Sequence, residues 1–212
     1  MPTFDIEQKI LDETNIKGKF LIAGGDEVGR GCLAGPVTVA LVILDPQNID
    51  ERINDSKKLS EALRDELYNI ITQTAIGYSI ASLDAKEIDR INILQATRKS
   101  FYNAAQKLLP KPNFLLLDAL EIKEIDLPQK KIIKGDSLSY SIAAASILAK
   151  VYRDKLMQKY EKKYPGYDFK NNKGYGSPKH LSALKEIGTT PIHRLSFKPI
   201  KQDDQSQLTF NF

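Results

Sequence analysis

Residues 20–44 read FLIAGGDEVGRGCLAGPVTVALVIL, and this stretch decides the fold. Its first part, 20–26, is an apolar run that ends in two glycines and an aspartate, which is typical of a short buried strand. Its last part, 36–44, is rich in β-branched and aliphatic residues and predicts a second strand. The first strand therefore delivers an acidic pair, Asp26 and Glu27, to a glycine-rich connection.

Further strands and helices are predicted outward from this stretch. The other strands are expected at 77–83, 113–118 and 130–134. Helices are expected from Ser60 to about residue 72, from Asp84 to about residue 109, over 139–163, and from Ser177 to Gly188. On the second of these helices, the side chains expected to face the core are Ile88, Ile91, Leu94, Phe101, Ala105 and Leu108. This order predicts an α/β (α+β) fold with one mixed sheet flanked by helices.

Three segments are expected along the chain. Residues 1–163 should form the core with the sheet, and residues 164–200, which are polar and rich in loops, should form a small helical C-terminal subdomain. Residues 201–212 are predicted to be a flexible tail. A chain of 212 residues is long enough for one domain with a sizeable core.

Composition narrows the class of protein. Hydrophobic residues make up 42% and charged residues 27%, as in ordinary globular proteins, and no apolar run is long enough to cross a bilayer. The N-terminus does not read as a signal peptide, and the single cysteine, Cys32, fits a reducing compartment, so we expect a cytoplasmic protein. We also expect a monomer without a membrane partner. The net charge of +4 is mild, but lysines cluster at 130–134 and 155–179. These clusters permit a nucleic-acid partner, and the alternative is a solvated helix face.

Four carboxylates are the candidate chemical centre. Asp26–Glu27 alone could be a solvated turn, but Asp118 ends a second apolar run and Asp136 follows the next predicted strand. Carboxylates that converge from separate strands repel one another unless cations neutralise them. Oxygen ligands suit Mg²⁺ or Mn²⁺, and two such ions can activate water and stabilise a leaving oxygen in phosphodiester cleavage. The sequence has no Cys/His cluster for zinc, no phosphate-binding GxxxxGK[ST] loop and no G-x-S-x-G element.

The sequence resembles a known family, the type 2 ribonucleases H, and specifically bacterial ribonuclease HII. The motifs that carry the resemblance are AGGDEVGRGCLAGPV (23–37), NDSKKLS (54–60), EIDRINILQAT (87–97), LLLD (115–118), KGDSLSYSIAAASILAKVYRD (134–154), KGYGSPKHLSAL (173–184) and PIHRLSF (191–197). They run in the family's order through most of the chain. Departures from the family pattern are Ala119 where glycine is common after the third carboxylate, Cys32 where proline is common, and Gly176-Ser177 where threonine is usual.

The resemblance implies a function and a set of site residues. It implies a ribonuclease H-like core and an endonuclease that cuts the RNA strand of RNA–DNA hybrids, including single ribonucleotides within duplex DNA, and leaves 5′-phosphate and 3′-hydroxyl ends. It implies that the metal ligands, for two Mg²⁺ or Mn²⁺ ions, are Asp26, Glu27, Asp118 and Asp136. It implies nucleic-acid contacts from Gly29, Arg30, Gly31 and Tyr175, with the glycine-flanked backbone close to the 2′-hydroxyl that distinguishes RNA from DNA.

For several other residues the sequence allows both a functional and a structural interpretation. Asp154 competes with Asp136 for the fourth carboxylate role, and its alternative is a salt bridge to Arg153 or Lys150. Lys57, and Lys58 beside it, are candidates for phosphate binding or for solvated surface. The two histidines, His180 and His193, could assist a proton transfer, although a structural role is favoured. The tail sequence QSQLTFNF has spacings similar to those of peptides that bind the replication sliding clamp, which makes the clamp a candidate partner.

Overall fold

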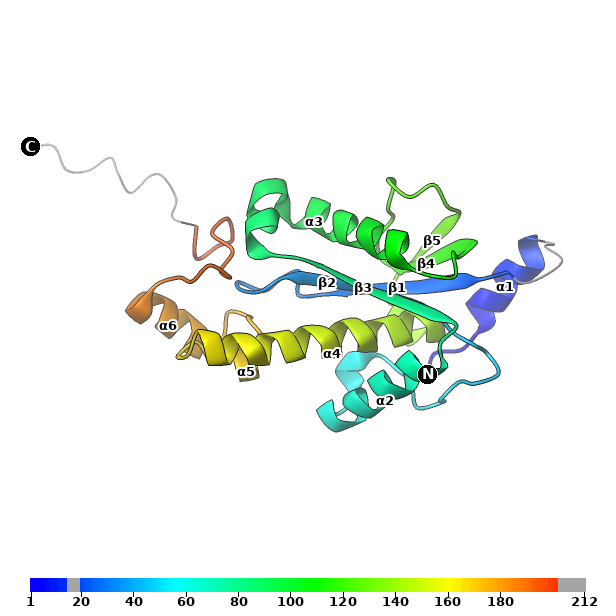
Figure 1. The fold of residues 1–212 in the computed structure, drawn as a ribbon, viewed down its shortest axis with the longest axis horizontal. Coiled ribbons are helices and arrows are strands. Elements are labelled where there is room, and N and C mark those ends of the chain that lie inside the picture. The colour runs from blue at the N-terminus through cyan, green and yellow to red at the C-terminus, as the bar shows by residue number, and fades with distance from the viewer. Residues whose placement is uncertain (15–19, 202–212) are drawn as a thin grey trace, which may run out of the picture.

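A computed structural model describes residues 1–14 and 20–201 of the chain. Five strands form one sheet between helices (Figure 1), so the predicted α/β class is confirmed. The elements are α1 (Asp5–Thr14), β1 (Ile22–Val28), β2 (Val37–Ile43), the 3-10 turn η1 (Ser56–Lys58), α2 (Glu61–Thr74), β3 (Gly77–Leu83), α3 (Ala85–Lys107), β4 (Phe114–Asp118), β5 (Gln129–Ile132), the 3-10 turn η2 (Gly135–Ser137), α4 (Tyr140–Lys163), α5 (Phe169–Asn172) and α6 (Pro178–Ile187). No helix in the described part of the chain is long and apolar enough to span a membrane.

The sheet has the order β3-β2-β1-β4-β5. The pairs β3–β2 and β2–β1 are antiparallel, whereas the pairs β1–β4 and β4–β5 are parallel. In the β1–β4 pair, Gly25 lies opposite Leu117. Because parallel strands end at the same edge of a sheet, this register brings the next residues, Asp26 and Asp118, to that edge together.

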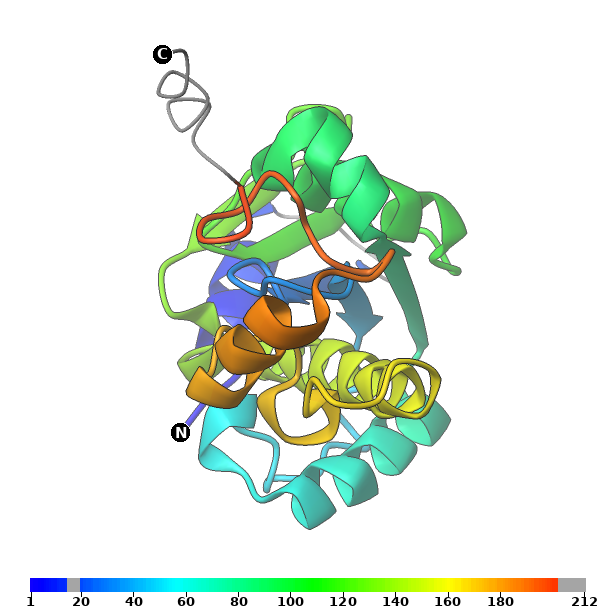
Figure 2. The same cartoon turned by 90° about the vertical axis from the view of Figure 1, so that its left-hand side faces the viewer.

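Helices cover both faces of the sheet (Figure 1). On β2 the side chains alternate: Val39 and Leu41 belong to the core cluster that contains Phe101 of α3, while Ala40 and Val42 belong to the cluster with α4 and α2. All seven residues of β2 are buried, as expected for a strand between two layers of helices. Seen from the end of the molecule that carries α6, the sheet lies between α3 and α4 (Figure 2).

The helix α4 lies unusually close to β1. A Cβ atom built on Gly24 would lie 2.1 Å from the carbonyl carbon of Ser141 and 2.5 Å from the backbone nitrogen of Ile142. Helix backbone therefore packs directly on strand backbone, and the small residues at 141 and 143–146 permit this approach. The contact fixes the start of α4, and with it η2, over the middle of the sheet.

The long helix predicted from Asp84 to about residue 109 is not continuous. Asn92 has φ 65° and ψ 165°, so α3 consists of two helical segments, and the Asn92 side chain accepts a hydrogen bond from the backbone N–H of Gln95 to begin the second. The break changes which side chains face inward: Leu94 is 38% exposed, against prediction, while Ala96 and Thr97 are buried. A single helical periodicity applied to the whole segment cannot predict such a break. One non-helical residue changes which of the following side chains face the core.

Helix boundaries were predicted well where side chains cap them. Ser60, Asp84 and Ser177 each accept a hydrogen bond from the backbone N–H three residues later, and Gly188 ends α6. Two helices, α1 and the short α5, were not predicted. Of the expected tail 201–212, only Lys201 lies within the described residues, so the flexible-tail prediction falls outside them.

Candidate active site at the edge of the sheet

Three aspartates meet at the edge where β1 and β4 end. One carboxylate oxygen from each of Asp26, Asp118 and Asp136 lies within 4.8 Å of the others. They come from β1, β4 and η2, three elements that are far apart in sequence. The convergence predicted for these residues is therefore present, with oxygen-only ligands of the kind that Mg²⁺ and Mn²⁺ prefer.

Burial and mutual repulsion make this cluster costly to charge. Burial is the main cause that raises the pKa of Asp26 well above its ordinary value, and the charges of Glu27 and Asp118 raise it further. Burial also raises the pKa of Asp118, against the opposing effect of a hydrogen bond that its Oδ1 accepts from the backbone N–H of Gly135 at 2.8 Å. A divalent cation would remove this cost, and the residues present fit one.

Glu27 lies beside the cluster but is turned to a different partner. Its Oε1 accepts a hydrogen bond from Nη1 of Arg30 at 3.0 Å, and its Oε2 is buried without a hydrogen-bond partner in the described part of the chain. Burial raises the pKa of Glu27, although Arg30 lowers it. A buried carboxylate oxygen that lacks a hydrogen-bond partner and lies next to three aspartates is available as a ligand atom for a cation.

Lys57 contacts the same cluster through Asp136. Its Nζ lies 3.0 Å from Oδ2 of Asp136 and 3.9 Å from Oδ1 of Asp55. The side chain of Lys57 remains 76% exposed, so it borders the cluster and open solvent at once. Lys58 pairs only with Asp55, at 3.9 Å, within the described chain.

The Gly29–Gly31 segment and Tyr175 lie side by side. Arg30 and Gly31 are exposed, Gly29 has φ +88°, and a Cβ atom on Gly31 would lie 4.0 Å from Cε1 of Tyr175. Tyr175 is 47% exposed. A backbone loop that follows the acidic pair in the chain and an aromatic ring next to that loop, both open to solvent, can accommodate a sugar.

Comparison with known proteins identifies the family. The family model described as Ribonuclease HII matches residues 23–200. The chain belongs to the ribonuclease HII family. Membership makes it a metal-dependent endonuclease that acts on the RNA of RNA–DNA hybrids.

Relatives and solved structures agree with this assignment. Ribonuclease HII of Desulfitobacterium hafniense (strain Y51) is 52% identical over 199 residues, which cover 93% of this chain and 76% of the relative, and ribonuclease HII of Listeria monocytogenes (strain HCC23) gives the same identity and shares. The crystal structure of ribonuclease H2 from Pyrococcus horikoshii superposes with a TM-score of 0.75 at 25% identity and covers 85% of this chain and 95% of that one. A ribonuclease HIII from a complex with Mn²⁺ shares the fold, with a TM-score of 0.65 at 19% identity over 87% of this chain and 69% of that one.

The competing carboxylate, Asp154, is engaged elsewhere in this ribonuclease HII. Its Oδ1 lies 2.9 Å from Nζ of Lys150, one helical turn earlier in α4. The predicted salt-bridge reading is therefore confirmed with Lys150 as the partner. Arg153, the other partner considered, instead donates to backbone carbonyls and is completely buried.

Two arginines of this ribonuclease HII, Arg153 and Arg194, were not predicted to be buried. Both side chains are fully buried and hydrogen bond to the loop that follows β1. Arg153 and Arg194 lie in the VYRD and PIHRLSF motifs, which were recognised. Their burial was not predicted, because nothing in the sequence around an arginine distinguishes a buried side chain from an exposed one. Cys32 lies in the same loop after β1 and is fully buried, with Sγ 3.6 Å from the carbonyl oxygen of Lys173.

The two histidines form one hydrogen-bonded chain beneath Tyr175. The N–H of Thr190 donates to Nδ1 of His193, the Nε2 atoms of the two rings lie 3.0 Å apart, and Nδ1 of His180 lies 2.8 Å from the carbonyl oxygen of Tyr175. Because Nδ1 of His193 accepts, its proton is on Nε2 and is donated to His180, which in turn donates from Nδ1 to Tyr175. Both rings are buried and pack on Phe169. The favoured structural role is confirmed, and it holds the Tyr175 backbone in place.

Both histidines should stay neutral in mildly acidic solution. Burial, with the neighbouring His180, lowers the pKa of His193 to about 4, and burial lowers that of His180. Histidines of the unfolded chain protonate near pH 6.5, before those of the folded protein. The free energy of unfolding should therefore decrease as pH falls from about 6.5 toward 4. ¹⁵N NMR of the two imidazoles should show protons on Nε2 of His193 and Nδ1 of His180 at pH 6. A normal titration near 6.5 would contradict the hydrogen-bonded chain.

Ala119 follows Asp118 in the left-handed region, with φ +50°. An L-residue there costs about 1–2 kcal/mol, which glycine avoids. We expect Ala119→Gly to raise the free energy of unfolding by about 0.5–1 kcal/mol and to leave cleavage unchanged. Urea denaturation should measure the gain, with Ala62→Gly at an exposed helical position of α2 as a control that lowers stability. A lower midpoint for Ala119→Gly would show that its conformation is not strained.

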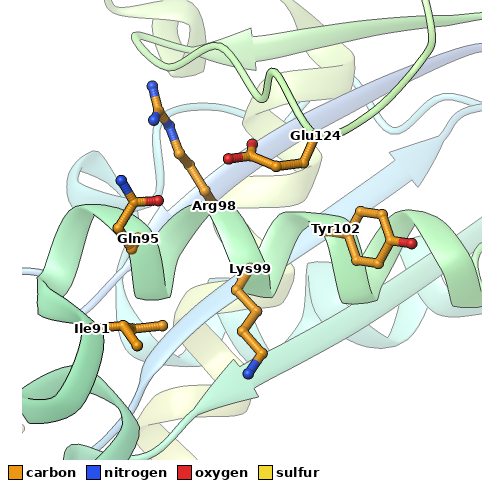
Figure 3. Close-up of a pocket in the computed structure, with 6 residues that line it drawn as sticks. All are labelled: Ile91, Gln95, Arg98, Lys99, Tyr102 and Glu124. Carbon is orange, nitrogen blue, oxygen red and sulfur yellow. The ribbon is translucent and has the colours of Figure 1, made fainter.

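A surface pocket on α3 is separate from this site (Figure 3). It is lined by Ile91, Gln95, Arg98, Lys99, Tyr102 and Glu124. In the figure, the Glu124 carboxylate extends toward Arg98, while Lys99 points away and pairs with Glu87 at 3.1 Å. None of the predicted site residues lines this pocket.

Proposed function

We propose that this ribonuclease HII cleaves at a single ribonucleotide embedded in duplex DNA, as well as in longer hybrids, with two divalent ions held by Asp26, Glu27, Asp118 and Asp136. The observation that carries the proposal is the convergence of three aspartates within 4.8 Å near the end of β1, from which the exposed Arg30 and Gly31 follow in the chain. The orphaned Oε2 of Glu27 supplies a fourth donor. Mg²⁺ or Mn²⁺, when bound, would lower the pKa of a water and stabilise the leaving oxygen.

The protein's own residues would orient the substrate. The side chain of Arg30 and the backbone of Gly29 and Gly31 are proposed to contact the 2′-hydroxyl, and Tyr175 to pack on the neighbouring deoxyribose. Lys57 is proposed to hold a phosphate beside Asp136, where its exposed ammonium already lies. Residues 164–200 are proposed as the subdomain that completes the cleft, because they carry Tyr175.

One cleavage experiment tests this function. A duplex DNA with one ribonucleotide, an all-DNA duplex of the same sequence and an RNA–DNA hybrid are incubated with Mg²⁺ and Mn²⁺ in turn, and the cut position is mapped. We expect one cut at the ribonucleotide, with 5′-phosphate and 3′-hydroxyl ends, and no cut in all-DNA duplex. Cleavage of the all-DNA duplex would instead favour a DNA nuclease such as a junction resolvase, and no cleavage with either metal would favour a hybrid-binding protein.

We also propose that the tail recruits the replication sliding clamp. The sequence QSQLTFNF supports this, and a ribonuclease HII from Archaeoglobus fulgidus was solved in complex with PCNA. That structure shares the fold of this chain, with a TM-score of 0.72 at 24% identity over 88% of this chain and 100% of that one. Equal clamp binding by the full chain and by a chain that ends at Lys201 would overturn the proposal.

A further inference from the structure

Two guanidinium groups lie beneath the loop that joins β1 to β2. Arg153 of α4 and Arg194 both have a relative exposure of 0%. Within residues 1–14 and 20–201, no carboxylate lies within ion-pair distance of either one. Buried cations without an anion are costly, so their charges need another partner.

Backbone carbonyl oxygens are that partner. Arg194 donates to the carbonyls of Gly29 (2.6 Å), Arg30 (2.8 Å) and Gly35 (2.9 Å). Arg153 donates to those of Pro36 (2.9 Å), Ala34 (3.0 Å) and Lys173 (2.7 Å). The two buried side chains therefore hydrogen bond to most of the carbonyls of the β1–β2 loop, residues 29–36. Burial lowers the pKa of Arg194 to about 10, so the group stays charged at neutral pH.

The inward carbonyls determine where the amide donors point. In a trans peptide, the C=O of one residue and the N–H of the next point in opposite directions. The carbonyls of Gly29 and Arg30 point into the protein, toward the buried Arg194. The N–H groups of Arg30 and Gly31 therefore point in the opposite direction, toward solvent. In the described chain neither N–H donates to another backbone group, and both residues are exposed. The loop thus presents two free donors next to each other.

Arg153 links the same loop to the tyrosine. It bonds the carbonyls of both Ala34 and Lys173, and the N–H of Leu33 donates to the carbonyl of Gly174 at 2.8 Å. Tyr175 follows directly. The fit is tight, since a Cβ atom on Gly29 would lie 2.2 Å from Nε of Arg153.

We propose that Arg153 and Arg194 are positioning residues for the recognition of RNA: they hold the loop so that the N–H groups of Arg30 and Gly31 donate to the 2′-hydroxyl oxygen, with Tyr175 at a fixed distance. The inference rests on the proposed function. Arg194 sets the direction of the donors, and Arg153 sets the spacing between loop and ring. The guanidinium fork matters as much as the charge, because an ammonium cannot bond three carbonyls in one plane.

The test compares binding of two duplexes that differ by a single 2′-hydroxyl. All proteins carry Asp118→Asn to prevent cleavage, and fluorescence anisotropy gives the dissociation constants. We expect Arg194→Lys to reduce the preference for the ribonucleotide duplex about tenfold, while affinity for the all-DNA duplex changes less than about twofold. Arg52→Lys, the same change at an exposed arginine paired with Asp50 and Glu66, should leave both constants unchanged.

A second measurement needs no change at the buried arginines. In ¹⁵N-labelled Asp118→Asn protein, the amide signals of Arg30 and Gly31 should shift with the ribonucleotide duplex and stay in place with the all-DNA duplex. Equal shifts with both duplexes, or a folded Arg194→Lys protein that keeps its full preference, would overturn the inference. If the parent protein itself shows no preference between the duplexes, the proposed function fails instead, and the two failures are thereby distinguished.

Discussion

Asp118→Asn should lower cleavage of RNA–DNA hybrids on the order of a thousandfold or more while the protein stays folded. Asparagine keeps an oxygen that can accept the Gly135 N–H, so the local structure is retained. Burial raises the pKa of Asp118, which means that its charge at neutral pH costs the metal-free fold stability. The substitution should therefore leave the free energy of unfolding unchanged or raise it, and hybrid binding should persist.

Two measurements separate this result from a general loss of structure. Mn²⁺ should raise the melting temperature of the wild-type protein much more than that of Asp118→Asn, because one ligand is lost. Asp126→Asn, at an exposed carboxylate in the loop after β4, should behave as wild type in both assays. Near-normal cleavage by Asp118→Asn with either Mg²⁺ or Mn²⁺ would remove Asp118 from the metal site.

Gly24→Ala should lower the free energy of unfolding by more than about 3 kcal/mol, or prevent folding altogether. The new methyl group would lie 2.1 Å from the Ser141 carbonyl carbon and 2.4 Å from its oxygen. Both atoms belong to the backbone of α4, so no side chain can rotate away, and the helix would have to separate from β1. Urea denaturation followed by circular dichroism should measure the loss.

The matched control is Gly31→Ala. A Cβ atom there meets nothing nearer than 4.0 Å, and its backbone conformation does not require glycine. Its unfolding midpoint should match that of wild type, while cleavage at a single ribonucleotide should fall because the methyl group stands where the sugar is proposed to lie. A wild-type midpoint for Gly24→Ala would show that α4 can move outward at little cost.

The sequence predicted those parts of the fold that depend on local patterns. The positions of Asp26 and Asp118 were predicted correctly. The strands of a sheet covered by helices on both faces are recognisable as apolar runs, and a carboxylate at the end of such a run stands out. Capping residues such as Ser60 and Ser177 fixed helix starts for the same local reason. The metal-site interpretation also needed Asp136, whose position depends on how α4 packs against Gly24.

Features that depend on long-range packing were not predictable. The break at Asn92 alters the exposure of Leu94 without a proline or glycine to mark it. Arg153 and Arg194 lie 41 positions apart in sequence and meet under one loop, which no periodicity indicates. The pairing of Glu27 with Arg30, and of Lys57 with Asp136, likewise depends on the chain turning back on itself.

Those two pairings give the site a consequence of its own. Arg30 pairs with Glu27 and Lys57 pairs with Asp136, at 3.0 Å in each case, so both cations neutralise acids that are proposed to bind metal. If Glu27 or Asp136 held a divalent ion, Arg30 or Lys57 would be free to pair with the nucleic acid, and if a phosphate paired with Arg30 or Lys57, the carboxylate would be free to hold the metal. Linkage requires the two effects to be equal. Metal and substrate should each tighten the binding of the other, so that the site is assembled by exchange of ionic partners.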